Sequence, residues 1–388
     1  MLRKKIVLVA TRFPFPIEKG DKLRTYYLLK YLQVHHDIYL ITLTEDLIST
    51  RQVNEIKQFT KEIHLFKLSK FRKFLRLFFG LFNSKPLQVN YFTDYKIKVK
   101  ISALLDDIKP DHIICQLIRS AEYVKNYHHC PKTIDYMDAL SKGMERRAIK
   151  SNFLLKFIFD LEARRLKDYE QRIFNYFENQ AIISQQDLNY VAHPDKNKML
   201  ILPNGIDAYY FEELQVSQTY DLVFVGNLNY PPNIDAINFL LESILPAIPN
   251  RTLLISGANP SNSLIQQIKS TPNASITGWV DDIRTSYLQG KILVAPMQIG
   301  TGMQNKILEA MALGIPTVTT TLANNAINGL HQESIWVADT KEEIIQGIET
   351  LLADVENYEK IRKNAREFVI KKYNWAAIVN TLVRAIQV

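Results

Sequence analysis

Residues 295–320 read APMQIGTGMQNKILEAMALGIPTVTT, and this stretch contains the repeating unit of the fold. The run Ile292 to Pro296 that leads into it is short, apolar and uninterrupted, which is typical of a strand buried on both faces. Gly300 and Gly302 leave backbone amides uncovered where a helical pattern begins, and Thr317 to Thr319 is the next strand-like run. Strand, helix and strand at this spacing predict a parallel sheet in an α/β fold.

The same alternation recurs in both halves of the chain. In the second half, strand-like runs end in glycine at Leu222 to Gly226 and Leu253 to Gly257, with a helical pattern from Ala236 to Ile244 between them. The first half has strand-like runs at Ile6 to Ala10, Ile38 to Thr42 and Thr133 to Asp135, and a helical pattern from Leu23 to Val34. Leu104 to Ile108, followed by Lys-Pro-Asp and Ile113 to Cys115, repeats the unit. A long charged helical pattern runs from Arg146 to Phe177, and Ala181 to Ser184 follows as a strand end.

Two domains follow from this pattern. Pro203-Asn204-Gly205 is a turn signal between the halves. We predict two Rossmann-like domains, residues 1–200 and 201–372, with the helix at 373–388 packing back on the first domain. The carboxyl ends of their parallel sheets are expected to face each other across a cleft, which is where open α/β sheets bind ligands.

Composition sets the broad class of protein. The 388 residues exceed what one core usually organises, and the 47% of hydrophobic residues support packed domains. No apolar run approaches the roughly 20 residues that span a bilayer, so we expect a cytoplasmic protein. Cys115 and Cys130 do not make a disulfide framework and lack metal or redox spacing. The formal net charge of +8 favours anionic partners: nucleic acid, an anionic membrane surface or phosphate-bearing substrates.

The helix that follows the two glycines carries a candidate site. Lys306 lies one turn into this helix and Glu309 lies one turn further on nearly the same face. A helix N-terminus with a lysine suits a diphosphate, and a carboxylate about 5 Å further along suits the hydroxyls of a ribose. The alternative is an ordinary surface pair of lysine and glutamate at i,i+3 beside a glycine turn.

Seven segments in order carry a resemblance to a known family: FPFPIEKGDKLR, TIDYMDALSKGMERRA, ISQQDLNYV, LPNGIDAYYF, FVGNLNYPPNIDAINFL, TGWVDDIR and GTGMQNKILEAMALGIPTVTT. They are similar to glycosyltransferase family 4, whose members have the two-domain GT-B fold, and to a bacterial branch associated with exopolysaccharide genes. The resemblance implies retaining transfer of a sugar from a UDP- or GDP-linked donor, with no metal required and no cofactor besides that donor.

The resemblance also implies residue roles. Glu309 matches the second glutamate of the family's paired motif, which holds the donor ribose. The first glutamate is replaced by Thr301, so that Thr301, Gly302, Met303 and the neighbouring Gln304 stand at the donor sugar. After Gly226, relatives place an arginine and a lysine where this chain has Asn227 and Asn233, which leaves the phosphates to Lys306 and Arg24. Gly278 and Val280 belong to the loop that recognises the base, where Trp279 either stacks or packs.

The first domain offers further candidates at the expected carboxyl edge of its sheet. Gly20 lies in a loop where its amide approaches a phosphate or acceptor, or it is a plain turn glycine. Arg24 points into the cleft or is solvated. Asp135 and the candidate catalytic residue Asp138 bind the acceptor, or they cap the next helix.

No metal site is predicted from the sequence. The chain has no Asp-x-Asp motif and no histidine spacing typical of zinc, so leaving-group assistance falls to Lys306 and the helix amides. Two rival functions remain open: a nucleotide-sugar epimerase of similar fold and a non-catalytic nucleotide-sugar-binding protein.

The segment 66–85 is basic and aromatic, with six lysines and arginines, no acidic residue and many phenylalanines. One interpretation is an interfacial helix on an anionic membrane at the inner face of the cell, with a lipid-linked sugar as acceptor. The other is an amphipathic helix packed on its own domain. Binding of nucleic acid lacks an accompanying recognition motif and is not expected.

Overall fold

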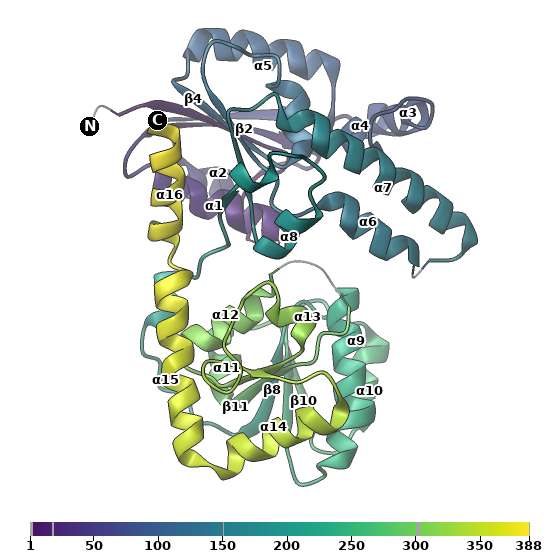
Figure 1. Ribbon diagram of the computed structural model, residues 1–388, viewed down its shortest axis with the longest axis vertical. Coiled ribbons are helices and arrows are strands. Elements are labelled where there is room, and N and C mark those ends of the chain that lie inside the picture. Colours follow the sequence, from purple (N-terminus) through teal and green to yellow (C-terminus); the bar gives the residue numbers. More distant parts are fainter. Residues whose placement is uncertain (1–2, 18, 150, 300–302, 388) are drawn as a thin grey trace. The chain divides into compact units, whose positions relative to one another are not determined.

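The computed structural model describes residues 3–17, 19–149, 151–299 and 303–387. The chain divides into two compact units (Figure 1). Unit 1 contains Met1–Pro203 and Trp375–Val388, and unit 2 contains Asn204–Asn374. The first boundary therefore lies inside the Pro203-Asn204-Gly205 turn.

Unit 1 is built on a seven-stranded sheet in the order β3-β2-β1-β4-β5-β6-β7, and all neighbouring strands are parallel. The strands are β1 (Lys5–Ala10), β2 (Asp37–Thr44), β3 (Glu62–Lys67), β4 (His112–Gln116), β5 (Lys132–Asp135), β6 (Asn179–Ile182) and β7 (Leu200–Ile201). The helices are α1 (Gly20–Leu32), α2 (Thr50–Lys57), α3 (Lys70–Gly80), α4 (Leu87–Phe92), α5 (Tyr95–Ile108), η1 (Ile118–Tyr123), α6 (Leu140–Ile149), α7 (Phe153–Phe174), α8 (Gln185–Tyr190), η2 (Lys196–Lys198) and α16 (Trp375–Gln387).

Alternating residues of β1 explain why this sheet has helices on both faces. Ile6 and Leu8 belong to one core, which α1 and α16 cover, whereas Val7 and Val9 belong to a second core under α5 and α7. Successive side chains of a strand point to opposite faces, so an uninterrupted apolar run requires cover on both sides. The doubly wound architecture follows from this run.

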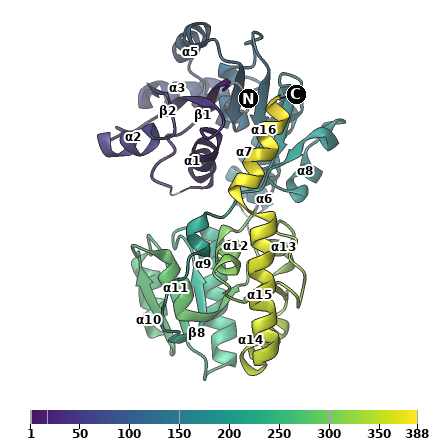
Figure 2. The same ribbon diagram turned by 90° about the vertical axis from the view of Figure 1, so that its left-hand side faces the viewer.

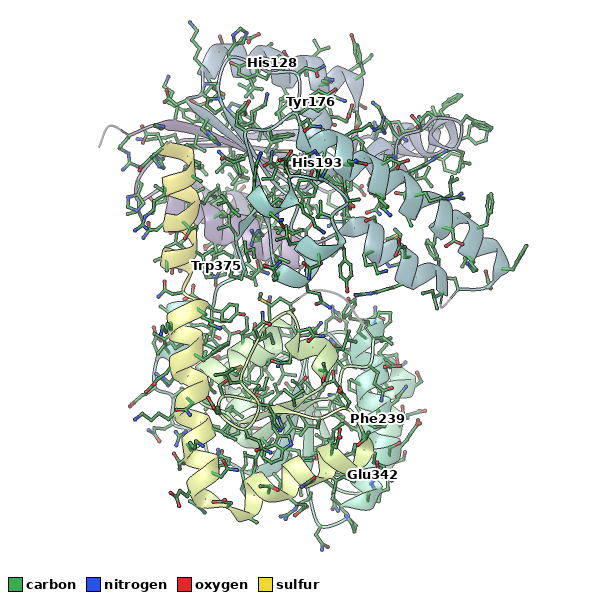
Figure 3. All side chains as sticks on the ribbon, in the orientation of Figure 1. His128, Tyr176, His193, Phe239, Glu342 and Trp375 are labelled. Carbon is green, nitrogen blue, oxygen red and sulfur yellow. The ribbon has the colours of Figure 1, made fainter. Side chains whose placement is uncertain are left out.

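The C-terminal helix α16 is part of unit 1 and packs against α1 (yellow in Figures 1 and 2). Trp375 lies at the start of α16 (Figure 3). It is buried and stacks on Tyr27 with ring centroids 5.0 Å apart. Burial of so large a ring stabilises the association of α16 with this unit.

The prediction of a single helix from Arg146 to Phe177 is wrong. The structure has two helices there, because α6 ends at Ile149 and α7 begins at Phe153. Asn152 precedes α7 with extended backbone, and its Oδ1 accepts a hydrogen bond from the amide of Leu155 at 3.1 Å. A side-chain oxygen that caps a new helix start competes with continuation of the previous helix.

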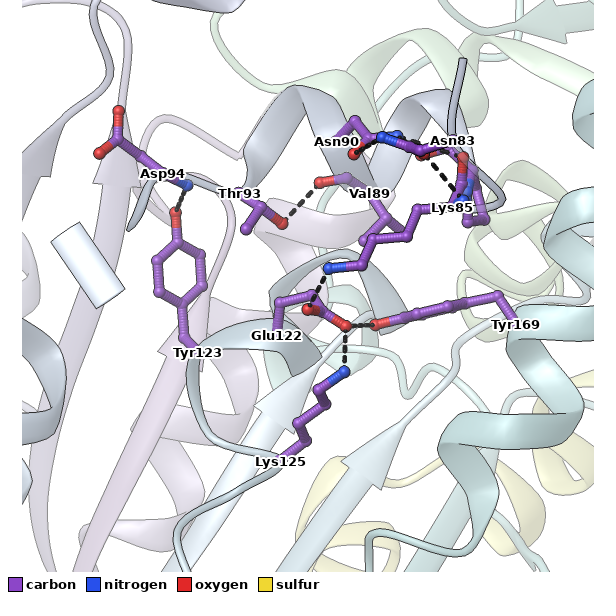
Figure 4. Close-up of polar contacts among 11 residues, drawn as sticks. Asn83, Lys85, Val89, Asn90, Thr93, Asp94, Glu122, Tyr123, Lys125 and Tyr169 are labelled. Atoms are coloured by element: carbon purple, nitrogen blue, oxygen red, sulfur yellow. Dashed lines mark hydrogen bonds and ion pairs between the residues drawn. The ribbon is translucent and has the colours of Figure 1, made fainter. Parts of the chain in front are cut away.

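A buried carboxylate links three segments of unit 1 (Figure 4). Glu122, in η1, accepts hydrogen bonds from Lys85 (2.8 Å), Lys125 (2.6 Å) and the hydroxyl of Tyr169 (2.9 Å). Burial opposes ionisation of this carboxyl, but the hydrogen bonds from Lys125 and Lys85 outweigh burial and lower the pKa of Glu122 to about 2. The charged form of Glu122 is therefore stabilised by folding.

This network predicts a pH-dependent contribution to stability. Because the folded pKa of Glu122 lies below its ordinary value, the contribution is present above about pH 4.5 and is lost as the pH falls towards 2. Glu122→Gln is expected to lower the free energy of unfolding by about 3 kcal/mol at neutral pH, and the difference from wild type closes in acid. Urea titrations across pH 3–7 measure this difference. The control, Glu359→Gln in an exposed pair with Arg362, should change it by less than about 0.5 kcal/mol, and equal losses in both variants would contradict the assignment.

Unit 2 has the same alternation of strands and helices, with a six-stranded parallel sheet in the order β10-β9-β8-β11-β12-β13. The strands are β8 (Tyr220–Val225), β9 (Leu253–Ser256), β10 (Ala274–Gly278), β11 (Gly290–Ala295), β12 (Thr317–Thr319) and β13 (Trp336–Val337). The helices are η3 (Ala208–Phe211), α9 (Pro231–Phe239), η4 (Leu240–Ile244), η5 (Leu245–Ala247), α10 (Asn262–Ser270), α11 (Ile283–Gln289), α12 (Asn305–Ala312), α13 (Thr321–Asn324), α14 (Lys341–Ala353) and α15 (Val355–Lys372).

Candidate functional site

The predicted site residues of unit 2 gather where its strand order reverses. The central strands β8 and β11 are neighbours, and the chain leaves them in opposite directions across the sheet, towards β9 and towards β12. Ligands of open α/β sheets bind beyond the carboxyl ends of the strands at such a point. The turn after β8 contains Gly226 and Asn227, and α12 follows the segment after β11.

Lys306, in the first turn of α12, is buried rather than solvated. Its ammonium donates hydrogen bonds to Oδ1 of Asn233 and to Oε1 of Gln304 (3.4 Å), and it lies 5.0 Å from the centre of the Phe224 ring. Burial disfavours the charge and lowers the pKa of Lys306 to about 7, although the neighbouring Glu309 acts in the opposite direction. The burial excludes the alternative of a surface lysine-glutamate pair.

Asn233 and Gly226 hold Lys306 in place. The Asn233 amide donates to the carbonyl of Asn227 at 2.8 Å, which orients its oxygen towards the lysine. A Cβ on Gly226 would lie 2.7 Å from this amide nitrogen and 3.4 Å from Cε of Lys306, so only glycine fits without displacement. Asn233 is thus the support of Lys306.

Glu309 lies one turn after Lys306 and is partly buried. Its Oε2 accepts a hydrogen bond of 2.7 Å from the hydroxyl of Tyr287, and Tyr210 also donates to this carboxylate. Burial raises the pKa of Glu309, and the two tyrosines and Lys306 counteract it. The two tyrosines fix the carboxylate on the same side of α12 as the lysine.

The segment before α12 is described only in part. Gly300, Thr301 and Gly302 lie outside the described residues. Met303 packs against the core of unit 2, and Gln304 is buried at the N-cap position of α12, with its side chain at Lys306.

The predicted base loop follows β10. Gly278 ends this strand at a φ of +72°, and its carbonyl accepts a hydrogen bond from the amide of Gly257 at 3.0 Å. The Trp279 side chain is 70% exposed, so the packing alternative for this residue is wrong. Val280 is partly buried.

The candidates of unit 1 Arg24 and Asp135 bind each other. The Arg24 guanidinium donates through Nε and, at 3.1 Å, through a terminal nitrogen to the two oxygens of Asp135, and both side chains are buried. Gly20 is the first residue of α1 rather than part of a loop, which corrects its predicted placement. The apolar helical pattern begins only at Leu23, whereas the helix itself begins about one turn earlier, at Gly20.

Asp138 follows β5 and is partly buried. Burial and the neighbouring carboxylate of Asp187 raise the pKa of Asp138 to about 6, although Arg119 favours its charged form. Met137, directly before it, has a φ of 61°, an unusual backbone conformation for a side chain of this size. A partly buried carboxyl with a raised pKa, such as that of Asp138, is a candidate proton-transfer group.

Unit 1 also has a pocket of about 460 Å³ beyond the carboxyl ends of β1 and β2. It is lined by cationic, aromatic and acidic side chains, which include Arg12, Lys19, Lys22, Phe13, Phe15, Glu45, Asp46, Tyr91 and Phe92. No local sequence pattern predicts this pocket, because its lining comes from three separate segments, 11–22, 43–52 and 91–92.

Within residues 3–17, 19–149, 151–299 and 303–387, no group of three or more histidine, cysteine, aspartate or glutamate side chains is arranged to hold a metal ion. Among the helices that the structure describes, none is long and apolar enough to cross a membrane.

The geometry agrees with comparisons to known proteins. Residues 219–354 match the family model described as "Glycosyl transferases group 1". Over 400 aligned residues the chain is 20% identical to a Klebsiella pneumoniae protein described as "Uncharacterized 44.6 kDa protein in cps region". The alignment covers 98% of this chain and 99% of that protein. The matched segment lies within unit 2 and contains Lys306 and Glu309.

Solved structures resemble the whole chain. Sucrose-phosphate synthase from Thermosynechococcus elongatus has a TM-score of 0.72 at 15% identity and covers 99% of this chain and 98% of that chain. Anabaena Alr3699/HepE in complex with UDP has a TM-score of 0.72 at 13% identity and covers 99% of both chains, and it is also solved with UDP-glucose. Unit 2 therefore matches a group 1 glycosyltransferase domain, and the predicted α/β fold with two parallel sheets, of the GT-B type, is confirmed.

Proposed function

We propose that the protein is a retaining glycosyltransferase of family 4, which moves a sugar from a nucleotide-diphosphate sugar to a saccharide or lipid-linked acceptor. The observation that carries this proposal is the buried Lys306 at the start of α12, with Glu309 one turn further along. A buried cation that is held by amide oxygens rather than by a carboxylate is costly, and an anionic ligand offsets that cost. The resemblance to HepE, which is solved with UDP and with UDP-glucose, supports a nucleotide sugar as this ligand.

Each group would have a separate role in the transfer. The Lys306 ammonium and the amides at the start of α12 stabilise the negative charge that develops on the departing nucleoside diphosphate. The Glu309 carboxylate, held by two tyrosines, accepts hydrogen bonds from the donor ribose. The proposed reaction uses these groups without a metal ion.

The acceptor is proposed to bind unit 1. The pocket beyond β1 and β2 offers aromatic faces, which suit sugar rings, beside the cations Arg12, Lys19 and Lys22, which suit phosphate. Asp138 is the proposed acid-base or acceptor-positioning group. A role in surface polysaccharide or glycolipid assembly is supported by the similarity to a protein of a cps region.

A thermal-shift screen against UDP, GDP and their sugar conjugates tests the donor. A donor at 100 times its dissociation constant stabilises the protein by about 2.7 kcal/mol. Glu309→Gln, which retains an acceptor for the tyrosines but loses the charge, is expected to weaken donor binding about tenfold. Its melting temperature without ligand should stay close to that of wild type.

Glu342→Gln on α14 is the matched control, because this exposed glutamate should leave binding unchanged. The absence of a shift with every nucleotide sugar would overturn the proposal, as would wild-type affinity in Glu309→Gln. Donor binding without transfer to any acceptor would favour the non-catalytic alternative, and donor conversion without an acceptor product would favour an epimerase.

A further inference from the structure

Helix α3 turns its apolar face outward. Five phenylalanines of α3 and the turn after it are between 51 and 77% exposed: Phe71, Phe74, Phe78, Phe79 and Phe82. Their spacing of three and four residues places them on one side of the helix, and the rings of Phe78 and Phe82 contact each other with centroids 5.7 Å apart. An amphipathic helix that packed on its own domain through its apolar face would bury these rings, so the second interpretation of segment 66–85 is wrong for this face.

Ion pairs fix this orientation from the opposite side. Lys73 binds Glu45 at 3.0 Å, and Arg76 binds Asp94 at 2.6 Å. Beyond the helix, Lys85 binds the buried Glu122 at 2.8 Å (Figure 4). These cations face the domain, so the usual arrangement of a surface helix, with charges outward and apolar residues inward, is reversed.

Helix α7, which contacts the end of α3, also carries exposed apolar side chains. The guanidinium of Arg165 in α7 donates to the carbonyls of Gly80 (2.8 Å) and Leu81 (2.9 Å), which ties the end of α3 to that helix. The first turns of α7 expose Phe153 and Phe157 as well. Large apolar surface rimmed by polar residues marks an interaction site.

The charge of the chain is divided unequally between the two units. Unit 1 contains 36 lysines and arginines against 22 aspartates and glutamates, a formal net charge of +14, whereas unit 2 contains 12 against 18, a net charge of −6. The phenylalanine face therefore lies on the strongly cationic unit. This combination complements an anionic lipid surface, since lipid offers both an apolar interior and negative headgroups.

We propose that the phenylalanine face of α3 inserts into the interface of an anionic lipid bilayer and docks unit 1 on the membrane. The eleven residues of α3 span about 16 Å, roughly half the hydrocarbon thickness, so the helix lies along the surface. On the opposite side of α3, Lys73 contacts Glu45, which lines the pocket beyond β1 and β2, so docking places that pocket about one helix diameter from the lipid surface.

Co-sedimentation of the full chain with vesicles tests the proposal. Wild type is expected to sediment with mixed vesicles of phosphatidylglycerol and phosphatidylcholine. The bound fraction should be smaller with phosphatidylcholine alone and should fall as the salt concentration increases. Phe74→Ser with Phe78→Ser should weaken the binding at least about tenfold, because each withdrawn ring loses its burial in lipid. Both side chains are exposed, so the melting temperature should not fall.

Val355→Ser with Ile370→Ser is the matched control, because these apolar residues are exposed on α15 of unit 2. This control should bind vesicles like wild type. Equal binding of the phenylalanine variant, or no binding of wild type to anionic vesicles, would overturn the proposal. A wild-type dimer in light scattering that becomes monomeric in the phenylalanine variant would also overturn it, since a second copy would then cover this face. No donor is present in the assay, so its outcome is independent of the proposed transferase activity.

Discussion

Lys306→Met is expected to weaken binding of the nucleotide-sugar donor about a hundredfold or more while raising the melting temperature of the protein without ligand. Truncation of one partner of a buried, hydrogen-bonded charge pair typically costs about 2–5 kcal/mol of binding free energy, and every 1.4 kcal/mol is about tenfold in affinity. Methionine keeps most of the volume of the side chain between Asn233 and Phe224 but has no charge. Isothermal titration and thermal unfolding measure the two effects.

The opposite signs of the two effects follow from the pKa of Lys306. Burial lowers this pKa to about 7 in the folded protein. Each pKa unit by which the folded value lies below the unfolded value corresponds to about 1.4 kcal/mol. Because the unfolded chain binds this proton more tightly, the lysine destabilises the fold fully below pH 7. The destabilisation fades as the pH rises from 7 to the ordinary lysine value. A lysine kept for packing alone would lower stability when replaced, and that result would contradict the assignment.

The same lowered pKa predicts how donor affinity depends on pH. Below about pH 7 the free protein already carries the ammonium charge that a diphosphate requires. Above it, each pH unit should raise the dissociation constant up to tenfold, because the lysine must take up a proton on binding. Lys306→Met should show no such dependence, and the exposed control Lys360→Met should behave like wild type. A flat pH profile in wild type would exclude Lys306 as the phosphate-binding cation.

The sequence predicted those parts of the fold in which local pattern decides the structure. The apolar runs at Ile6 to Ala10 and Leu222 to Gly226 became the central strands β1 and β8, because continuous burial needs continuous apolar residues. Strand β10 was missed, because Ala274 to Gly278 has short polar side chains and is an edge strand of its sheet. The break at Asn152 was missed, because a cap competes with helical propensity over a single turn.

The candidate site was predictable only where its residues share one helix. Lys306 and Glu309 are three residues apart, so helix geometry alone places them on one side. Their partners come from other elements: Phe224 from β8, Asn233 from α9 and Tyr287 from α11. No local pattern encodes contacts over such sequence separations, which is why Asn233 looked like a departure from the family rather than the residue that holds the lysine.

Unit 1 shows the same limit in Arg24 and Asp135, which the sequence presented as separate ligand contacts. Asp135→Ala is expected to lower the free energy of unfolding by about 3–5 kcal/mol, because it leaves the Arg24 guanidinium buried without its carboxylate. The pair joins α1 to the end of β5, 111 residues away in the sequence. Chemical denaturation measures the loss.

A second variant separates the cost of an isolated charge from the value of the pair. Arg24→Met with Asp135→Leu removes both charges and fills much of their volume, so it should recover a large part of the stability that Asp135→Ala loses. The exposed pair of Arg362 and Glu359 is the control, and loss of either partner there should change stability by less than about 1 kcal/mol. If Asp135→Ala instead unfolds like wild type but fails to use an acceptor, Asp135 is an acceptor ligand. Its contact with Arg24 is then a resting arrangement that the acceptor displaces.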